Sequence, residues 1–132
     1  MFTPPPRPEP TPINMEHALE SLQGNAQLLT TVVQLVIAQS GVDMAVIRSD
    51  VAAKNASALA ASSHRLKGSL GAIAAVPAYQ ACSALNKLAR SGCDAAYAMG
   101  LNHLEEEIDR LLPTLQSWLD HIKNQGIEDG KS

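Results

Sequence analysis

Residues 94–124, DAAYAMGLNHLEEEIDRLLPTLQSWLDHIKN, are the stretch of this 132-residue chain that decides its fold class. Apolar side chains recur there at intervals that alternate between four and three residues, which places them on one side of an α-helix. They are Tyr97, Leu101, Leu104, Ile108, Leu111, Leu115, Trp118 and Ile122. We therefore predict one long helix buried along a single seam, with Tyr97 and Trp118 in the core. Pro113 lacks the amide hydrogen that an interior helical position donates, so we expect it to kink this helix.

Four further helices are expected before this stretch, each bounded by residues that commonly begin or end helices. Their predicted limits are 14–22, 25–53, either 55–74 or 57–74, and 77–92, with Ser40-Gly41 as a possible bend or break in the second. The second helix is expected to face the core with apolar residues at helical spacing: Leu28, Val32, Leu35, Val42 and Val46. No stretch alternates as a β-strand does. We therefore predict an all-α fold, an antiparallel four-helix bundle with a short additional N-terminal helix.

The prolines divide the chain. Six of the eight lie between Pro4 and Pro12, a stretch that cannot hold a helix. Residues 1–13 are therefore expected to be a Pro-rich flexible tail or linker. Residues 14–124 are expected to form the helical domain, and residues 125–132 a disordered polar tail. A chain of 132 residues allows one hydrophobic core but leaves little room for two.

Composition narrows the possible partners. Apolar residues make up 45% of the chain and aromatic residues 3%, so the core must be mainly aliphatic. The net charge of -3 leaves no basic surplus for neutralising nucleic-acid phosphates.

No apolar run approaches the roughly 18 residues of a membrane span, so no direct membrane insertion is expected. There is no signal-peptide pattern after Met1. Cys82 and Cys93 have no metal or redox spacing, which favours free thiols in a cytoplasmic protein.

The third predicted helix carries the candidate chemistry. Its apolar residues, Leu59, Leu66, Leu70 and Ile73, fall on one side and are expected to face the core. His64 lies opposite them. Its own side carries Lys67, Gly68 and Gly71, and the remaining positions there are the alanines Ala60, Ala61 and Ala75.

An exposed helical face made of such small residues is unusual. Each glycine inside a helix costs about 1 kcal/mol relative to alanine. Two glycines beside His64 therefore suggest a surface that another molecule approaches closely. A neutral imidazole is a good nucleophile, and the ammonium group of Lys67, one turn away, can neutralise an incoming phosphoryl group.

The run His64-Arg65-Leu66-Lys67-Gly68-Ser69 resembles the His-x-Leu-Lys-Gly-Ser motif of histidine phosphotransfer (HPt) domains. The resemblance extends over most of residues 14–122, and residues 82–92, CSALNKLARSG, are similar to the helix that follows the motif in that family. It implies that His64 shuttles a phosphoryl group between the aspartates of receiver domains in a multistep phosphorelay. It also implies that Lys67 supports the phosphoryl group and that Gly68 leaves room for the docking receiver.

The same resemblance places Asn86 and Arg90, which share one helical face, near His64, and we expect Ala61 and Gly71 to complete the docking surface. Asn86 stands where the family usually has Glu or Gln, and it could still hydrogen-bond near the imidazole. Ile73-Ala74 stands where the family often has Leu-Gly. The implied partners are response regulator receiver domains and a hybrid sensor histidine kinase. The chain would act in the cytoplasm, either free or tethered as the C-terminal module of a membrane-bound hybrid kinase.

No nucleotide-binding glycine loop and no acidic cluster for magnesium are present in the sequence. We therefore expect no cofactor on this chain and no autonomous ATP-dependent kinase activity, with Mg²⁺ on the partner receiver. One alternative is a degenerate, non-catalytic helical adaptor that docks receiver domains, which Asn86 keeps open. A metal-binding bundle is a second alternative, but no two His or Cys residues form an i, i+4 pair of ligands. His17, His103 and His121 are expected on the surface, and Glu105, Glu106 and Glu107 on a solvated face.

Overall fold

The computed structural model describes the backbone of residues 12–131 and the side chains of residues 12–122. Its elements are α1 (Met15–Ser21), α2 (Ala26–Ala52), α3 (Ala56–Ala72), α4 (Val76–Ser91), the 3-10 turn η1 (Asp94–Ala96) and α5 (Tyr97–Lys131). No strand occurs among residues 12–131. The prediction of an all-α fold is confirmed.

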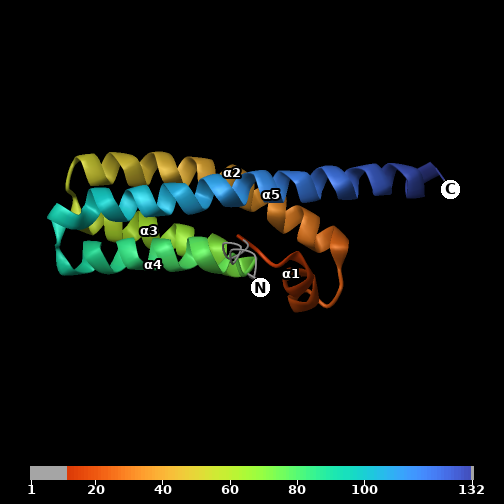
Figure 1. Cartoon of the computed structure of the whole chain (residues 1–132), viewed down its shortest axis with the longest axis horizontal. Coiled ribbons are helices and arrows are strands. Elements are labelled where there is room, and N and C mark those ends of the chain that lie inside the picture. Colours follow the sequence, from red (N-terminus) through yellow and green to blue (C-terminus); the bar gives the residue numbers. More distant parts are fainter. Residues whose placement is uncertain (1–11, 132) are drawn as a thin grey trace, which may run out of the picture.

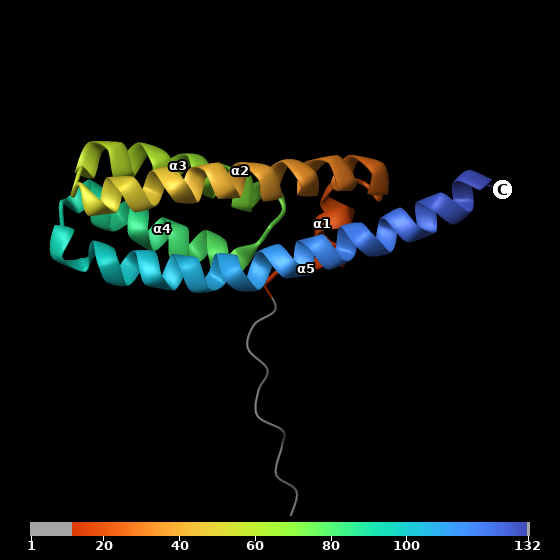
Figure 2. The same cartoon turned by 90° about the horizontal axis from the view of Figure 1, so that it is seen from above.

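The four long helices pack side by side. α2 contacts α3 and α5, and α4 contacts the same two helices from the other side. Figures 1 and 2 show that helices adjacent in the chain run in opposite directions, with short connections at the ends. α1 lies against the N-terminal part of α2. This packing gives α3 a neighbour on each flank and leaves one side of it open.

Asparagine side chains fix where three of the helices begin. Asn14, Asn25 and Asn55 each accept a hydrogen bond from a backbone N–H of the first turn, at 3.0, 2.9 and 3.0 Å. Such caps satisfy donors that have no partner within the helix. α4 instead has a proline, Pro77, in its first turn, and it ends at Gly92, whose φ of 72° is left-handed. The predicted helix starts follow from these local contacts.

The apolar seam of α5 lies in the core as predicted. Tyr97 is 1% exposed, and Leu104, Ile108, Leu111 and Leu115 are also buried. The other seam residues, Leu101, Trp118 and Ile122, are partly buried. In Figure 2 the second half of α5 turns away from the line of the first half. Pro113 lies near the middle of the helix, where its missing hydrogen bond predicts a kink.

The predicted core side of α2 is wrong. Leu28, Leu35, Val42 and Val46 are 45%, 63%, 58% and 37% exposed, whereas Val32, the fifth residue of the predicted set, is partly buried and packs against the core. α2 shows no break at Ser40-Gly41. The core side instead carries Leu29, Val33, Val36, Ser40, Asp43, Met44 and Ile47. Both sides of α2 repeat apolar residues at helical spacing, and two polar residues interrupt the buried one. Periodicity alone therefore pointed to the wrong side.

α2 also bears on the membrane prediction. Within the described part of the chain it is the one helix that is long and apolar enough to cross a membrane, with a mean hydropathy of 1.5 over its best 18 residues. The prediction that no segment is long and apolar enough to span a membrane is therefore wrong for α2. Core helices of soluble proteins and signal sequences meet the same criterion, and 33% of this 18-residue window is buried inside the structure.

The ends of the domain differ from the predicted boundaries. Ile13, predicted as the last residue of a flexible tail, is 6% exposed and belongs to the core. α5 was predicted to end near Asn124, but it continues through Lys131, where a disordered tail was expected. A formed helix extends by one hydrogen bond per added residue, and no proline follows Pro113 to stop it. The predicted tail over residues 1–11 lies outside the described residues.

Candidate functional site

His64 lies in the middle of α3 on its open side. Leu59, Leu66 and Leu70, on the opposite side of the helix, are each 0% exposed, as predicted. The His64 side chain is exposed, and no hydrogen bond or ion pair engages its imidazole among the described side chains. A ring in this state is free to react with an approaching molecule.

The helical repeat that places His64 stops at the end of α3. Ile73 is 0% exposed, as predicted, but Ala75 is also 0% exposed although it was expected on the same face as Ala60 and Ala61. α3 ends at Ala72, and Ala74 has a φ of 54°. The left-handed residue turns the chain, so positions beyond it no longer follow the wheel of α3.

A shallow hollow of about 340 Å³ lies beside the His64 ring. Its walls are Ala60, Ala61 and His64 from α3 together with Asn86 and Arg90 from α4. Helical side chains lean toward the N-terminus of their helix, so the imidazole leans toward the two alanines. Three residues of the predicted docking surface, Ala61, Asn86 and Arg90, thus lie together around the histidine.

Asn86 was expected to hydrogen-bond near the imidazole, but its side chain binds the α3 backbone and Ser63 instead. It is 4% exposed, and its Nδ2 donates to the Ala60 carbonyl oxygen at 2.9 Å and to Ser63 Oγ at 3.0 Å. In an α-helix the Ala60 carbonyl also accepts the N–H of His64. Asn86 therefore fastens α4 to the turn of α3 that carries the histidine, and it leaves the ring free.

Polar contacts also hold α3 on its other flank. Ser62 Oγ donates to Asp50 Oδ2 at 2.8 Å, and Arg65 Nε lies 3.4 Å from Asp43 Oδ1, both partners being on α2. Contacts on both flanks fix the rotation of α3 about its own axis. That rotation keeps His64 pointing to solvent.

Cys82, on α4, is buried and contacts the same turn of α3. Its Sγ donates to the Ser63 carbonyl oxygen at 3.1 Å. Burial raises the pKa of this thiol to about 12, although the positive charge of Lys67 partly opposes the shift. Cys82 and Cys93 are both free, and Cys93 is exposed. Cys82 is therefore a small apolar packing group rather than a nucleophile.

Lys67, Gly68 and Gly71 lie outside the hollow, on the next turns of α3. A Cβ atom added at Gly68 would meet nothing within 4 Å. No contact among the described residues therefore requires a glycine at that position. The ammonium of Lys67 lies 5.7 Å from the centre of the Tyr79 ring on α4.

Three residues that shape the site were not predicted from the sequence to do so: Ser63, Tyr79 and Cys82. Ser63 lies on the buried side of α3 between His64 and the Asn86 amide. Tyr79, Cys82 and Asn86 follow each other on α4 at intervals of three and four residues, which marks one helical face. That spacing was available in the sequence and predicts a column of side chains against α3.

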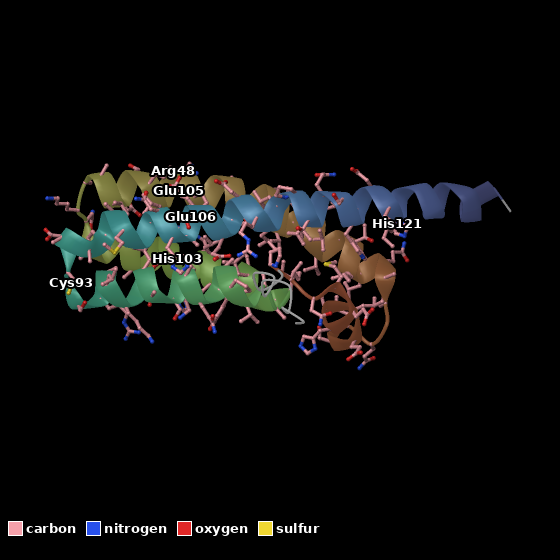
Figure 3. The ribbon with its side chains drawn as sticks, in the orientation of Figure 1. Arg48, Cys93, His103, Glu105, Glu106 and His121 are labelled. Carbon is pink, nitrogen blue, oxygen red and sulfur yellow. The ribbon has the colours of Figure 1, made fainter. Side chains whose placement is uncertain are left out.

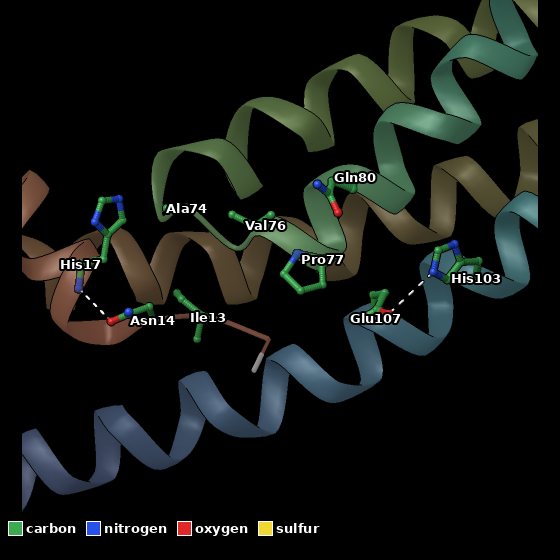
Figure 4. Close-up of a pocket in the computed structure, with 9 residues that line it drawn as sticks. All are labelled: Ile13, Asn14, His17, Ala74, Val76, Pro77, Gln80, His103 and Glu107. Atoms are coloured by element: carbon green, nitrogen blue, oxygen red, sulfur yellow. Dashed lines mark hydrogen bonds and ion pairs between the residues drawn. The ribbon is translucent and has the colours of Figure 1, made fainter. Parts of the chain in front are cut away.

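A larger hollow, of about 520 Å³, lies away from His64. Figure 4 shows its lining: Ile13, Asn14, His17, Ala74, Val76, Pro77, Gln80, His103 and Glu107. His17 and His103 stand at opposite ends of it, and His103 Nε2 pairs with Glu107 Oε2 at 3.6 Å. No cluster of metal-ligating side chains occurs here or elsewhere among the described residues. We therefore place the candidate chemistry at His64 and not in the larger hollow.

Glu105, Glu106, Glu107 and His121, which were expected on the surface, all lie on α5. Glu105 accepts a hydrogen bond from Arg48 Nε at 2.8 Å, and these two residues lie together in Figure 3. Glu106 and His121 are exposed, while Glu107 is partly buried and pairs with Arg110 at 2.9 Å. This surface binds α5 to α2 and adds no group to the His64 site.

The site therefore combines an exposed histidine with a lysine and a glycine one turn further along a packed helix. The family model of the Hpt domain matches residues 31–118. The chain belongs to the Hpt domain family, and the resemblance seen in the sequence is confirmed. No curated protein and no solved structure matches this chain. Hpt domains serve histidine phosphotransfer in phosphorelays, where they interact with response regulator receiver domains and kinases.

Proposed function

We propose that His64 is the phosphoacceptor of this Hpt domain and shuttles a phosphoryl group between the aspartates of receiver domains. The observation that carries the proposal is the free, exposed imidazole beside a hollow floored by alanines. An aspartyl phosphate on a partner can approach such a ring without displacing a side chain of residues 12–122. The Hpt family match supports the same chemistry.

The proposed step is an in-line transfer. The lone pair of His64 Nε2 attacks phosphorus, the P–O bond to the partner aspartate breaks, and the carboxylate leaves with the bonding electrons. The proton on Nδ1 stays on the ring, which carries a positive charge while that proton is bound. In the reverse direction the protonated ring is a good leaving group. The receiver would supply Mg²⁺, and this chain would supply the positioned nucleophile and need no cofactor of its own.

Two cations flank the proposed nucleophile. Arg90 is exposed and lines the hollow, and Lys67 lies one turn beyond His64. Either can approach the charge of a phosphoryl group on the ring. We propose that Lys67 assists the transfer, and that Ala61, Gly68, Gly71, Asn86 and Arg90 form the surface on which the receiver docks. The open space over Gly68 supports this surface, because no contact within the described part of the chain accounts for that glycine.

The test is transfer from a phosphorylated receiver to the purified chain, followed as acid-labile phosphate. We expect wild type to accept phosphate and His64→Gln to accept none, with His121→Gln, an exposed histidine on α5, as the matched control. Uptake by His64→Gln at the wild-type rate would refute the proposal. Lys67→Ala should slow transfer while the helical circular dichroism signal stays unchanged.

A degenerate adaptor that docks receivers without transfer is the second candidate. It is favoured by the placement of Asn86, whose amide binds backbone and Ser63 rather than supporting the imidazole. The two candidates separate in one experiment. An adaptor would bind a receiver in a pull-down or by calorimetry, yet show no phosphate on His64.

We further propose that α2 to α5 form an antiparallel four-helix bundle with α1 as the additional N-terminal helix, and that residues 13–124 are the phosphotransfer domain. The pairwise packing of the four helices and the burial of Ile13 support this. The proposed partners are response regulators and a hybrid sensor histidine kinase. The proposed place of action is the cytoplasm, with the chain either free or attached as the C-terminal module of a membrane-bound hybrid kinase. Fractionation of cells, with and without salt washing, would distinguish the two states.

A further inference from the structure

Tyr79 is the aromatic residue next to the proposed phosphoacceptor face. It projects from α4, is 37% exposed, and lies with its ring centre 5.7 Å from Lys67 Nζ. A cation within about 6 Å of an aromatic ring is attracted by the charge distribution of the ring. Because the separation is near that limit, the contact is weak and can be exchanged for a stronger one.

The Tyr79 ring lies against Gly71 of α3. A Cβ atom at Gly71 would lie 3.4 Å from Cε2 and 3.6 Å from Cδ2 of the ring, which is contact distance. The ring therefore rests beside the bare backbone of α3, one turn beyond Lys67. The Tyr79 ring thus lies within van der Waals reach of position 71 on α3.

Lys67 is partly buried, and its side chain has four rotatable bonds, so a contact that limits its movement is needed to keep the ammonium in one place. The Tyr79 ring limits that movement and keeps the ammonium on the α4 flank of α3, one helical turn from His64. A phosphoryl group on His64 would offer the ammonium a charge-assisted hydrogen bond, which is stronger than the contact with the ring. Lys67 could then move from the ring to the phosphoryl group over a short path.

We infer that Tyr79 is a positioning residue that holds the Lys67 ammonium beside His64 for phosphoryl transfer, an inference that rests on the proposed function. Tyr79 itself touches neither the nucleophile nor, in this scheme, the phosphoryl group. Its effect passes through Lys67. The loss expected on removing the ring is about two- to five-fold in the transfer rate, the size of an exposed cation–π contact.

The first measurement tests the contact without any phosphate. An aromatic ring shifts the NMR signals of protons above its face, so the ε-protons of Lys67 should be shifted upfield in the wild-type protein. Tyr79→Phe keeps the ring and should keep the shift, whereas Tyr79→Leu should abolish it. An unshifted Lys67 in wild type would overturn the inference whether or not His64 accepts phosphate.

The second measurement is the rate of transfer from a phosphorylated receiver. We expect Tyr79→Leu to be slower by about two- to five-fold and Tyr79→Phe to match wild type. In a Lys67→Met background, Tyr79→Leu should have no further effect, because the residue acts through the ammonium. Tyr79→Gln serves as a second variant without an aromatic ring should the leucine variant aggregate.

The outcomes are distinct. An equal slowing by Tyr79→Leu in the presence and absence of Lys67 would overturn the inference and show direct contact of Tyr79 with the receiver. Transfer at the wild-type rate in both ring-free variants would overturn it while leaving the proposed function intact. If the wild-type chain accepts no phosphate on His64, the proposed function fails, and the role of Tyr79 in transfer fails with it.

Discussion

The side-chain amide of Asn86 donates a hydrogen bond to the Ala60 carbonyl oxygen at 2.9 Å, one turn before His64 on α3. The same nitrogen donates to Ser63 Oγ at 3.0 Å. A buried amide with two acceptors on one helix fixes how α4 lies against it. The backbone of the α3 turn that carries His64 is therefore held in place by α4, whereas the imidazole ring itself makes no such contact.

Asn86→Ala should destabilise the fold. The substitution removes two hydrogen bonds and leaves a small cavity beneath Ala60 and Ser63, and we expect a loss of about 1–3 kcal/mol in the free energy of unfolding. Urea denaturation followed by circular dichroism measures it. Lys87→Ala, at the exposed neighbouring position, is the control and should change stability by less than about 0.5 kcal/mol. Equal effects of the two substitutions would show that the Asn86 contacts contribute nothing.

Gly68→Ala should separate stability from docking. A Cβ atom there meets nothing within 4 Å, and alanine favours a helix over glycine by about 1 kcal/mol, so the variant should be more stable. Gly68→Gln should fold equally but weaken receiver binding, because its side chain projects into the docking surface.

Gly41 on α2 provides a matched control, because a Cβ atom there also meets nothing within 4 Å. Gly41→Ala should raise stability without any change in receiver affinity. Calorimetric titration with a receiver domain measures the difference. Unchanged affinity in Gly68→Gln would place the docking surface elsewhere.

The two cysteines should differ in reactivity. Because burial raises the pKa of Cys82 to about 12, its thiol stays protonated and shielded near neutral pH, whereas Cys93 is exposed. Iodoacetamide at pH 8 should add one label to the native chain, at Cys93, and two labels in urea. Rapid labelling of Cys82 in the native protein would contradict its buried placement. A Cys93→Ser variant should remain unlabelled until it is unfolded.

The raised pKa of Cys82 also makes stability depend on pH. The folded state keeps the thiol proton between the ordinary pKa of 9.0 and about 12, whereas the unfolded state loses it. The free energy of unfolding contributed by this group is therefore complete below pH 9 and falls as the pH rises toward 12. Denaturation of wild type and Cys82→Ala at pH 8 and pH 10.5 isolates the effect. We expect the stability of wild type to fall more steeply than that of Cys82→Ala.

The two apolar sides of α2 should respond differently to truncation. Leu29 is 0% exposed, so Leu29→Ala should cost about 2–5 kcal/mol of stability. Leu28, its neighbour in the sequence, is 45% exposed, and Leu28→Ala should cost less than about 1 kcal/mol. Thermal and urea unfolding of this pair tests which side of α2 faces the core. A larger loss at Leu28 would restore the side that was predicted from the sequence.

Local features of the sequence determined the helices and the place of the candidate acceptor. Asn14, Asn25 and Asn55 begin helices because each accepts a hydrogen bond from an amide three residues ahead. The seam of α5 and the buried leucines of α3 followed from helical periodicity, and the outward direction of His64 followed from the same repeat. These interactions span only a few residues, so the sequence alone carries them.

Contacts between helices decided the rest. The buried side of α2 depends on which of its two apolar sides meets α3 and α5, and no spacing within α2 contains that information. The hydrogen bond from Asn86 to Ala60 and the approach of Lys67 to Tyr79 each join residues on different helices. Such pairs form only when α3 and α4 pack in one register and at one rotation. That packing is set by the fit of side chains from the whole core, which is why only the tertiary structure could place them.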